Sequence, residues 1–341
     1  MNPYLRDILS QPAALREALD RYSISALQPI ALAQFDRILI SGMGSSCYAA
    51  YPALIELSKQ PLPVQLVNAA ELLHSLNGMI GPRTLLWLNS QSGRSAELVN
   101  LLERIESAPP ARLLTVVNDT SSPMGAGADV CLPIHAGEEA TVSTKTYVNM
   151  LAVNLLAAVQ LAGGAVEPVL HELRAAADAM EAYLADWETR VQELDSALAD
   201  FDTLFLIGRG ASMSAVWNGS LINKEAAKCA FEGIHAADFR HGPLELVEKG
   251  FAALIFAGAH STTMDLNRRL ARDILARGGR VIWLDTKRDP VIPTFLIPET
   301  SARVRPLVEI LPMQTLTLVM ASRKGIQAGQ FRHVSKITSR E

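Results

Sequence analysis

The chain has 341 residues, of which 49% are apolar and 19% charged, and its formal net charge is −4 at pH 7. At about 150 residues per domain, this length predicts two domains or one large one, and the apolar content excludes a largely disordered chain. The weak negative charge argues against a strongly basic nucleic-acid surface. Three scattered cysteines without a CxxC pair are typical of a reducing compartment.

The start of the chain, residues 1–7, lacks the basic and apolar regions of a signal peptide. The most apolar long run, residues 147–166, is interrupted by Asn149, Asn154 and Gln160. A membrane span needs about 20 cleaner residues, so this run predicts a buried core helix. We therefore expect a cytoplasmic protein with neither a membrane nor a nucleic acid as partner.

Short apolar runs alternate with longer helix-like segments along the chain. Runs of this length are typical of strands buried on both faces of a parallel sheet. Their alternation with helices, expected for example at residues 95–107 and 264–277, predicts βαβ units with right-handed crossovers. The expected strands are Arg37–Ser41, Thr84–Leu88, Arg112–Val117, Val130–Pro133, Thr203–Ile207, Ala252–Ala257, Arg280–Leu284 and Pro293–Ile297.

The second half of the chain repeats the pattern of the first. Residues 39–46 resemble residues 205–212, which lie 166 positions later, and residues 112–117 resemble residues 280–285 at an offset of 168. Two offsets this similar, near half the chain length, predict two related α/β domains that arose by duplication. Apolar residues at helical spacing in residues 168–200 predict a helical connector between them.

Two hydroxyl-rich loops follow expected strands of the first repeat. Gly42-Met43-Gly44-Ser45-Ser46 ends one strand, and its glycines allow a close backbone approach while the following helix start attracts an anion. Asn89-Ser90-Gln91-Ser92-Gly93-Arg94-Ser95 ends the next, where open α/β sheets bind ligands. A tight turn and helix capping explain the glycine pair and Ser95 equally well, but they leave residues 90–92 unexplained. The two loops together predict a phosphate site built from hydroxyls and local dipoles.

The motif Ser90-Gln91-Ser92-Gly93-Arg94-Ser95 resembles the S-x-S-G-x-[ST] phosphate loop of the sugar isomerase (SIS) domain family. Gly44-Ser45-Ser46 resembles its companion loop, and Val142-Ser143-Thr144-Lys145 resembles the element that caps the bound sugar. The resemblance implies two tandem SIS domains, each a parallel five-stranded sheet flanked by helices in a three-layer α/β fold. The implied boundaries are 1–167 for the first domain with an N-terminal helical segment, 168–200 for the connector, 201–325 for the second domain and 326–341 for a tail that closes the active site.

Candidate acid–base residues lie in the second repeat. On a helix expected from Ala215 to Phe231, Glu225 falls at the edge of the apolar stripe, where partial burial can raise the pKa of a carboxyl toward that of a useful base. An exposed pair of Glu225 with Lys228 explains the same residues. His241 precedes a Gly-Pro turn and can titrate near neutrality, although His235 is a nearby rival and structural histidines are common.

The pattern is closest to the isomerase half of the glucosamine-6-phosphate synthases and to the related deaminases and deglycases. Lys224-Glu225 and Arg240-His241-Gly242-Pro243-Leu244 match a helical K-E pair and a K-H-G-P-L motif of that group at the same spacing. The resemblance implies that Glu225 moves a proton between C1 and C2, and that His241 opens the sugar ring across the interface of a homodimer. Ile222 stands where the group usually has a lysine.

The C-terminal tail, residues 330–338, resembles the closing tail of the same group. Lys336 matches a lysine that lies near the open-chain sugar, where an amine can form a Schiff base or stabilise the charge of an enediol. A basic tail in water is the alternative. Phe331 and Val334 favour a tail that packs on the protein.

These residues predict aldose–ketose chemistry on a phosphorylated sugar. Because the chain has no room for the glutaminase domain of the synthases, we expect the reverse reaction, from glucosamine 6-phosphate to fructose 6-phosphate and ammonia. A plain isomerase or a fructosamine-6-phosphate deglycase is the alternative enzyme, and a non-catalytic phosphosugar-binding regulator is the alternative of another class. No metal or organic cofactor is expected, since the histidines lack ligand spacing. The implied catalytic residues are Glu225, His241 and Lys336, and the implied substrate-binding residues are Gly44, Ser45, Ser46, Ser90, Gln91, Ser92, Ser95, Val142 and Ser143.

Overall fold

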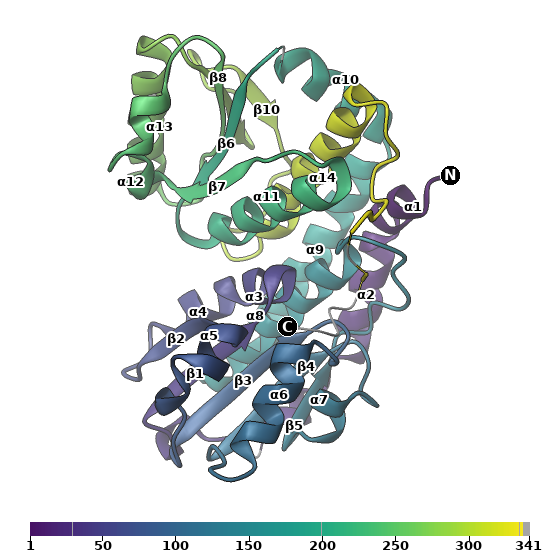
Figure 1. The fold of residues 1–341 in the computed structure, drawn as a ribbon, viewed down its shortest axis with the longest axis vertical. Coiled ribbons are helices and arrows are strands. Elements are labelled where there is room, and N and C mark those ends of the chain that lie inside the picture. The colour runs from purple at the N-terminus through teal and green to yellow at the C-terminus, as the bar shows by residue number, and fades with distance from the viewer. Residues whose placement is uncertain (29, 199, 334, 337–341) are drawn as a thin grey trace. The chain divides into compact units, whose positions relative to one another are not determined.

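The computed structural model describes residues 1–28, 30–198, 200–333, 335 and 336. The chain forms two compact units, each built around one parallel five-stranded sheet (Figure 1). The first-sheet unit comprises Ala13–Arg174 and the tail from Arg332, and the second-sheet unit comprises Met1–Pro12 and Ala175–Phe331. The expected α/β fold with two parallel five-stranded sheets is confirmed.

The first sheet has the strand order β2-β1-β3-β4-β5. Its inner strands are buried almost end to end because their residues are apolar on both faces. The edge strand β2 is only half-buried. The strands are β1 (Arg37–Gly42), β2 (Val64–Asn68), β3 (Thr84–Ser90), β4 (Arg112–Val117) and β5 (Val130–Pro133).

Helices cover both faces of the first sheet. The helices α5 and α6 share one apolar core with the strands, in which Leu72 and Leu98 pack against Leu39 and Leu86. The helices α3, α4 and α8 pack together on the other side, and α8 is buried from Thr146 to Val159, which confirms the expected core helix. The bounds are α2 (Gln11–Arg21), α3 (Gly44–Ala49), α4 (Tyr51–Leu57), α5 (Ala69–His74), α6 (Ala96–Ile105), α7 (Pro123–Ala126) and α8 (Lys145–Leu161).

The second sheet has the order β10-β9-β8-β6-β7, which is the order of the first sheet with each strand replaced by its counterpart from the second half. The shared topology agrees with the duplication that the sequence offsets predict. The strands are β6 (Thr203–Gly208), β7 (Glu232–His235), β8 (Phe251–Phe256), β9 (Arg280–Asp285) and β10 (Thr294–Leu296).

The helices of the second-sheet unit include the start of the chain. The Tyr4 hydroxyl accepts a bond from Thr317 Oγ1 at 3.2 Å, and the amides of Gln11 and Gln314 exchange bonds of 2.9 and 2.7 Å. The helix α11 packs on α14, and α13 covers β8 and β9. The bounds are α1 (Pro3–Leu9), α9 (Val166–Leu184), α10 (Trp187–Leu198), α11 (Met213–Ala227), α12 (Ala236–Phe239), α13 (Ser261–Ala276) and α14 (Pro306–Arg323). Short 3₁₀ turns lie at Gly210–Ser212 and Pro243–Leu246 in this unit, and at Ile24–Leu27, Leu32–Gln34 and Asn77–Met79 in the first-sheet unit.

All eight expected strands are present, with ends within two residues of those predicted. The strands β2 and β7 were not predicted, because neither is an apolar run. The prediction that α11 extends to Phe231 is wrong. The helix ends at Ala227 because Lys228 adopts a left-handed conformation with φ of 57°, and β7 starts four residues later. None of the helices in the described part of the chain has the length and apolar character that crossing a bilayer requires.

Candidate functional site

The two hydroxyl-rich loops follow neighbouring strands. The strand β1 pairs with β2 on one side and β3 on the other, and its register with β3 sets Gly42 opposite Asn89. The chain leaves β1 toward β2 on one side and leaves β3 toward β4 on the other, so the carboxyl ends of β1 and β3 border the topological switch point, where sheets of this order bind ligands. Asn89 Nδ2 also donates to the carbonyl of Ser41 at 3.2 Å. The fold therefore brings both predicted loops to one edge of the first sheet.

The loop after β1 runs directly into α3. A Cβ atom added at Gly42 would lie 2.8 Å from the carbonyl oxygen of Asn89, so only glycine allows this close approach. Ser45 and Ser46 lie half-buried in the first turn of α3, and no side chain caps that turn. The backbone N–H of Ser46 already donates to the carbonyl of Met43 at 3.2 Å, so the donors that the turn can offer are the two hydroxyls and the N–H groups that precede Ser46.

The loop after β3 is held by its own serines. Ser90 Oγ accepts a bond from the backbone N–H of Gly93 at 3.0 Å and lies 3.4 Å from Ser95 Oγ. Ser92 Oγ accepts from the N–H of Arg94 at 3.1 Å. A hydroxyl that accepts a bond still carries an O–H to donate. The serines that sequence reasoning could not explain by capping thus shape the loop and keep donor capacity for a ligand.

Ser95 occupies the N-cap position of α6, but its side chain caps no backbone N–H. The side-chain capping explanation of this serine is therefore wrong. Its half-buried hydroxyl adds to the donors at the start of a ten-residue helix, where the helix dipole favours negative charge. Gln91 is half-buried, and its carbonyl accepts from the N–H of Asn118 at 3.1 Å. Arg94 is exposed at the rim and pairs with Asp119 at 3.0 Å.

Val142 and Ser143 lie in a loop that a buried carboxylate organises. Glu139 Oε1 accepts from the N–H of Thr144 at 2.8 Å, from Thr144 Oγ1 at 3.0 Å and from the N–H of Thr146 at 3.1 Å, and Oε2 accepts from Thr146 Oγ1 at 2.7 Å. The Val142 side chain is buried, and Ser143 Oγ lies 2.9 Å from Thr146 Oγ1. Sequence reasoning missed Glu139. The acid ahead of the Thr-x-Thr start of α8 was the available signal.

The tail lysine lies at the same carboxylate. Lys336 Nζ contacts Glu139 Oε2 at 3.2 Å and also donates to the backbone carbonyl of Glu139. The first-sheet unit therefore brings together Lys336 and the loop with Val142 and Ser143. Phe331 is half-buried, whereas Val334, the other residue on which tail packing was predicted, lies outside the described residues.

Glu225 lies half-buried on α11, between exposed Lys224 and the buried side of the helix. Its position at the edge of the apolar stripe agrees with the helical spacing. Ile222 is fully buried, so the position that usually carries a lysine is part of the core here. Lys228 Nζ donates to the backbone carbonyl of Glu225 and, at 2.7 Å, to that of Gln330. The helical turn with Glu225 is thus tied to Gln330 at the start of residues 330–338.

The two rival histidines have different surroundings. His241 is exposed on the turn after α12, and its N–H donates to the carbonyl of Asp238 at 2.9 Å. His235 is half-buried at the end of β7 and meets the ring of Trp217 edge-on, with centroids 5.1 Å apart. Burial lowers the pKa of His235, and the charge of Asp238 only partly opposes this effect. A neutral, packed His235 fits a structural role, and His241 has the accessibility that a proton-transfer residue needs.

The equivalent position in the second sheet is occupied by internal charges. Ser212, the counterpart of Ser46, donates to Glu309 Oε1 at 2.9 Å. Arg305 pairs with Glu309 at 3.0 Å and with Asp285 at 2.9 Å, and all four of these side chains in the second unit are buried. A phosphate would have to approach two buried carboxylates and compete for a hydroxyl that is already used. This network disfavours an anion at the counterpart position of the second repeat.

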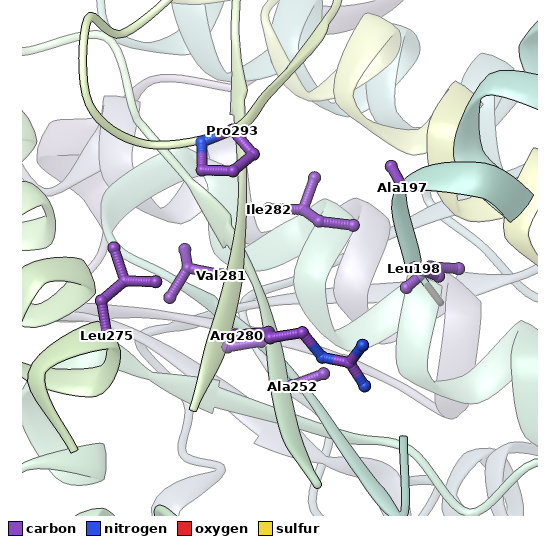
Figure 2. A pocket seen from close by; sticks show the side chains of 9 residues that line it. Ala197, Leu198, Ala252, Leu275, Arg280, Val281, Ile282 and Pro293 are labelled. Carbon is purple, nitrogen blue, oxygen red and sulfur yellow. The ribbon is translucent and has the colours of Figure 1, made fainter. Parts of the chain in front are cut away.

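A hollow of about 110 Å³ lies on the second sheet (Figure 2). Ala252 and Arg280, at the amino ends of β8 and β9, are among its lining residues, whereas ligands of such sheets bind at the carboxyl ends. Apart from Arg280 its walls are small or aliphatic, including Leu198 and Pro293. We do not assign this hollow to the functional site. Within the described residues, no group of three His, Cys, Asp or Glu side chains could hold a metal ion.

Part of the chain matches a known domain, and almost all of it is similar to part of a group of longer proteins. Residues 31–160, which contain β1 to β5, match the SIS domain. The glutamine–fructose-6-phosphate aminotransferases (isomerizing) of Pyrococcus horikoshii and Methanothermobacter thermautotrophicus are each 29% identical over 97% and 99% of the chain. The chain spans 56% and 57% of those two relatives. The first-sheet unit is thus similar to the SIS domain, and the chain is similar over almost its whole length to a part of these aminotransferases.

Solved structures share the fold over almost the whole chain. The C-terminal domain of glucosamine-fructose-6-phosphate aminotransferase from Francisella tularensis has a TM-score of 0.84 at 20% identity, covering 97% of this chain and 98% of that one. Tagatose-6-phosphate ketose/aldose isomerase from Escherichia coli has a TM-score of 0.81 at 19% identity, covering 97% and 96%. Glucosamine-6-phosphate deaminase from Thermotoga maritima has a TM-score of 0.79 at 18% identity, covering 98% and 99%. At these identities the likeness concerns the fold alone.

We predict that Gly93→Ala destabilises the loop after β3. Gly93 has a left-handed φ of 63°, and an added Cβ would lie 1.9 Å from Ser122 Oγ. The conformation costs about 1–2 kcal/mol, and the overlap adds about 1–3 kcal/mol. Gly163→Ala is the matched control, because its φ is 76° and nothing lies within 4 Å of its Cβ position. Urea unfolding should show a larger loss for Gly93→Ala, and equal losses would contradict the prediction.

We predict that His235 makes the folded protein sensitive to acid. Its folded pKa lies below the ordinary value of 6.5, which the unfolded chain regains. As the pH falls below about 6.5, the unfolded state therefore takes up a proton more readily than the folded state. The free energy of unfolding decreases as the pH is lowered. In His235→Gln, the loss of stability between pH 7 and pH 5 should be smaller in urea unfolding. Exposed His260→Gln is the control, and an unchanged loss in His235→Gln would show that another group is responsible.

Proposed function

We propose that this chain converts an amino sugar phosphate by moving a proton between C1 and C2, and that glucosamine 6-phosphate becomes fructose 6-phosphate and ammonia. The observation that carries the proposal is the pair of donor-rich loops at the switch point between β1 and β3. The similar aminotransferases support it, since their name joins fructose 6-phosphate to amine transfer and isomerization. Ring opening, proton transfer and loss of ammonia need no metal ion.

Recognition of the phosphate is assigned to hydroxyls and backbone N–H groups. In the proposal Gly44, Ser45 and Ser46 contribute from the start of α3, and residues 90–92 with Ser95 contribute from the loop after β3. Such a site holds an anion through local dipoles, so the overall charge of −4 does not oppose it. The loop with Val142 and Ser143 caps the sugar.

The chemistry needs an open-chain sugar and a base that reaches two carbons. In the proposal His241 transfers the proton that opens the ring, and Glu225 removes the proton from C2 and returns it to C1. The resulting C2 imine takes up water and releases ammonia, so glucosamine 6-phosphate and water balance fructose 6-phosphate and ammonia. Lys336 stabilises the oxygen that gains negative charge.

The assembly and the division of the chain are part of the same proposal. We propose a tandem SIS protein in which residues 1–167 bind the phosphosugar, 168–200 connect, 201–325 supply the acid–base residues and 326–341 close the site. We further propose a cytoplasmic homodimer, because His241 would then act across the subunit interface. The exposure of His241 within its own unit agrees with a role completed by a partner.

Two other enzymatic outcomes use the same residues. A ketose–aldose isomerase needs the same open chain and base without loss of an amine, and the fold of the tagatose-6-phosphate isomerase is shared. A fructosamine-6-phosphate deglycase releases a larger amine from the same carbon frame. A phosphosugar-binding regulator would use the loops alone.

We predict that the purified chain releases ammonia and fructose 6-phosphate from glucosamine 6-phosphate, and that Glu225→Gln lowers kcat by about 10²-fold or more. Both products are followed by coupled assays. Glu232→Gln is the matched control, because it removes the charge of an exposed carboxylate on β7 of the same unit. The control should keep the wild-type rate.

The alternatives give different results in the same experiment. Conversion of another hexose phosphate without ammonia would replace the deaminase by an isomerase. Release of an amine only from a fructosamine 6-phosphate would identify a deglycase. Binding of glucosamine 6-phosphate without turnover, unchanged in Glu225→Gln, would favour the regulator.

A further inference from the structure

Glu139 is a buried carboxylate of the first-sheet unit that accepts several hydrogen bonds. Its side chain is 1% exposed, and its two oxygens accept four bonds from the backbone and hydroxyls of Thr144 and Thr146. A buried carboxylate persists only where donors replace its water, and here the donors come from one short segment. Neither the phosphate loops nor the acid–base residues explain why a charged group is needed at this place.

One role of Glu139 is to cap α8. Thr144 is at the N-cap position of this 17-residue helix, and its own side chain caps no N–H. Glu139 accepts the N–H groups of Thr144 and Thr146 instead, so a negative charge lies at the positive end of the helix dipole. The carboxylate is therefore fixed by the rigid core helix, and the sugar-capping residues Val142 and Ser143 lie in the segment between the acid and the helix.

The second partner of this fixed group is the tail. Lys336 Nζ donates to Oε2 and to the backbone carbonyl of Glu139, and its side chain is 24% exposed. An ammonium group has three N–H donors, and two of them point to Glu139. One donor is left for a third acceptor.

We propose that Glu139 is a positioning residue that holds Lys336 at the sugar-capping loop, with one N–H left for an oxygen of the open-chain sugar phosphate. The identity of that substrate rests on the proposed function, whereas the docking of the tail on Glu139 does not. A donor aimed at an oxygen that gains charge stabilises the transition state more than the ground state. Loss of Glu139 should therefore affect kcat more than KM.

The first test needs no substrate. Arg332 is exposed in the tail, and trypsin cleavage after it, followed by mass spectrometry, reports undocking of the segment. We expect Glu139→Gln and Lys336→Gln each to speed this cleavage about fivefold or more, and the double variant to be no faster than the faster single one. Lys336→Gln leaves the α8 cap intact, so the result does not depend on whether Glu139→Gln weakens the fold.

Asp36→Asn is the control. It removes one charge from the exposed pair of Asp36 with Arg83, 2.7 Å apart in the same unit, and should leave cleavage after Arg332 unchanged. Two single variants that leave cleavage at the wild-type rate, or whose effects multiply in the double variant, would overturn the proposal.

The second test uses glucosamine 6-phosphate. We expect Glu139→Gln to lower kcat on the order of 10- to 100-fold with KM changed much less, and to have no further effect when Lys336 is already glutamine. An unchanged kcat in a variant whose tail is released would overturn the positioning role. If the wild type turns over no hexose phosphate, the proposed function fails, while the cleavage experiment still decides whether Glu139 holds Lys336.

Discussion

The reversal of strand order between β1 and β3 is the constraint on which the candidate site depends. The strands β2 and β3 pair with opposite edges of β1. The connections that leave β1 and β3 therefore run to opposite sides, and no crossover covers the carboxyl ends of these two strands. Every residue in those two loops is then next to a sheet that is fixed by buried pairing. Close backbone contact at Gly42 and the bond from Asn89 to Ser41 make the edge rigid. Short polar loops on such a frame can present donors without lysine or a metal ion.

A buried carboxylate near the last helix distinguishes the two copies of the sheet. In the first unit Glu139 lies at the start of α8 and receives hydroxyls and N–H groups of its own segment, which leaves Ser45 and Ser46 after β1 uncommitted to it. In the second unit Glu309, on the corresponding last helix α14, takes the hydroxyl of Ser212 after β6. Burial raises the pKa of Glu309, and Arg305 opposes that shift. One topology therefore carries two loops with hydroxyl and N–H donors in one copy and a closed network of buried charges in the other.

The sequence predicts the inner strands well because burial on both faces leaves continuous apolar runs. Both missed strands, β2 and β7, occupy the same edge position in their sheets, where Gln65 and Glu232 are exposed and the run is short. The error at the end of α11, which was predicted to extend to Phe231, has a different cause. Cys229 and Phe231 continue the apolar pattern and are buried, but Lys228 has already turned the chain out of the helix. Apolar periodicity reports burial, and it does not report a change of backbone conformation at one residue.

The sequence indicates candidate site residues where several polar side chains lie in one short stretch. Ser90 and Ser92 stand out because several donors follow one strand, whereas the only local signal for Glu139 is an acid ahead of two threonines, and its third partner, Lys336, is 197 residues away. An acid in a polar loop has the same sequence signature whether water or a helix end satisfies it. Only the fold shows that this charge is buried, and burial is what makes it consequential. The buried carboxylate of Glu139 is bonded to five donors in place of water. Because bonds in such a network strengthen one another, we expect the loss of one donor to weaken the remaining bonds. The segment that leads into α8 and the tail lysine are therefore held by the same carboxylate.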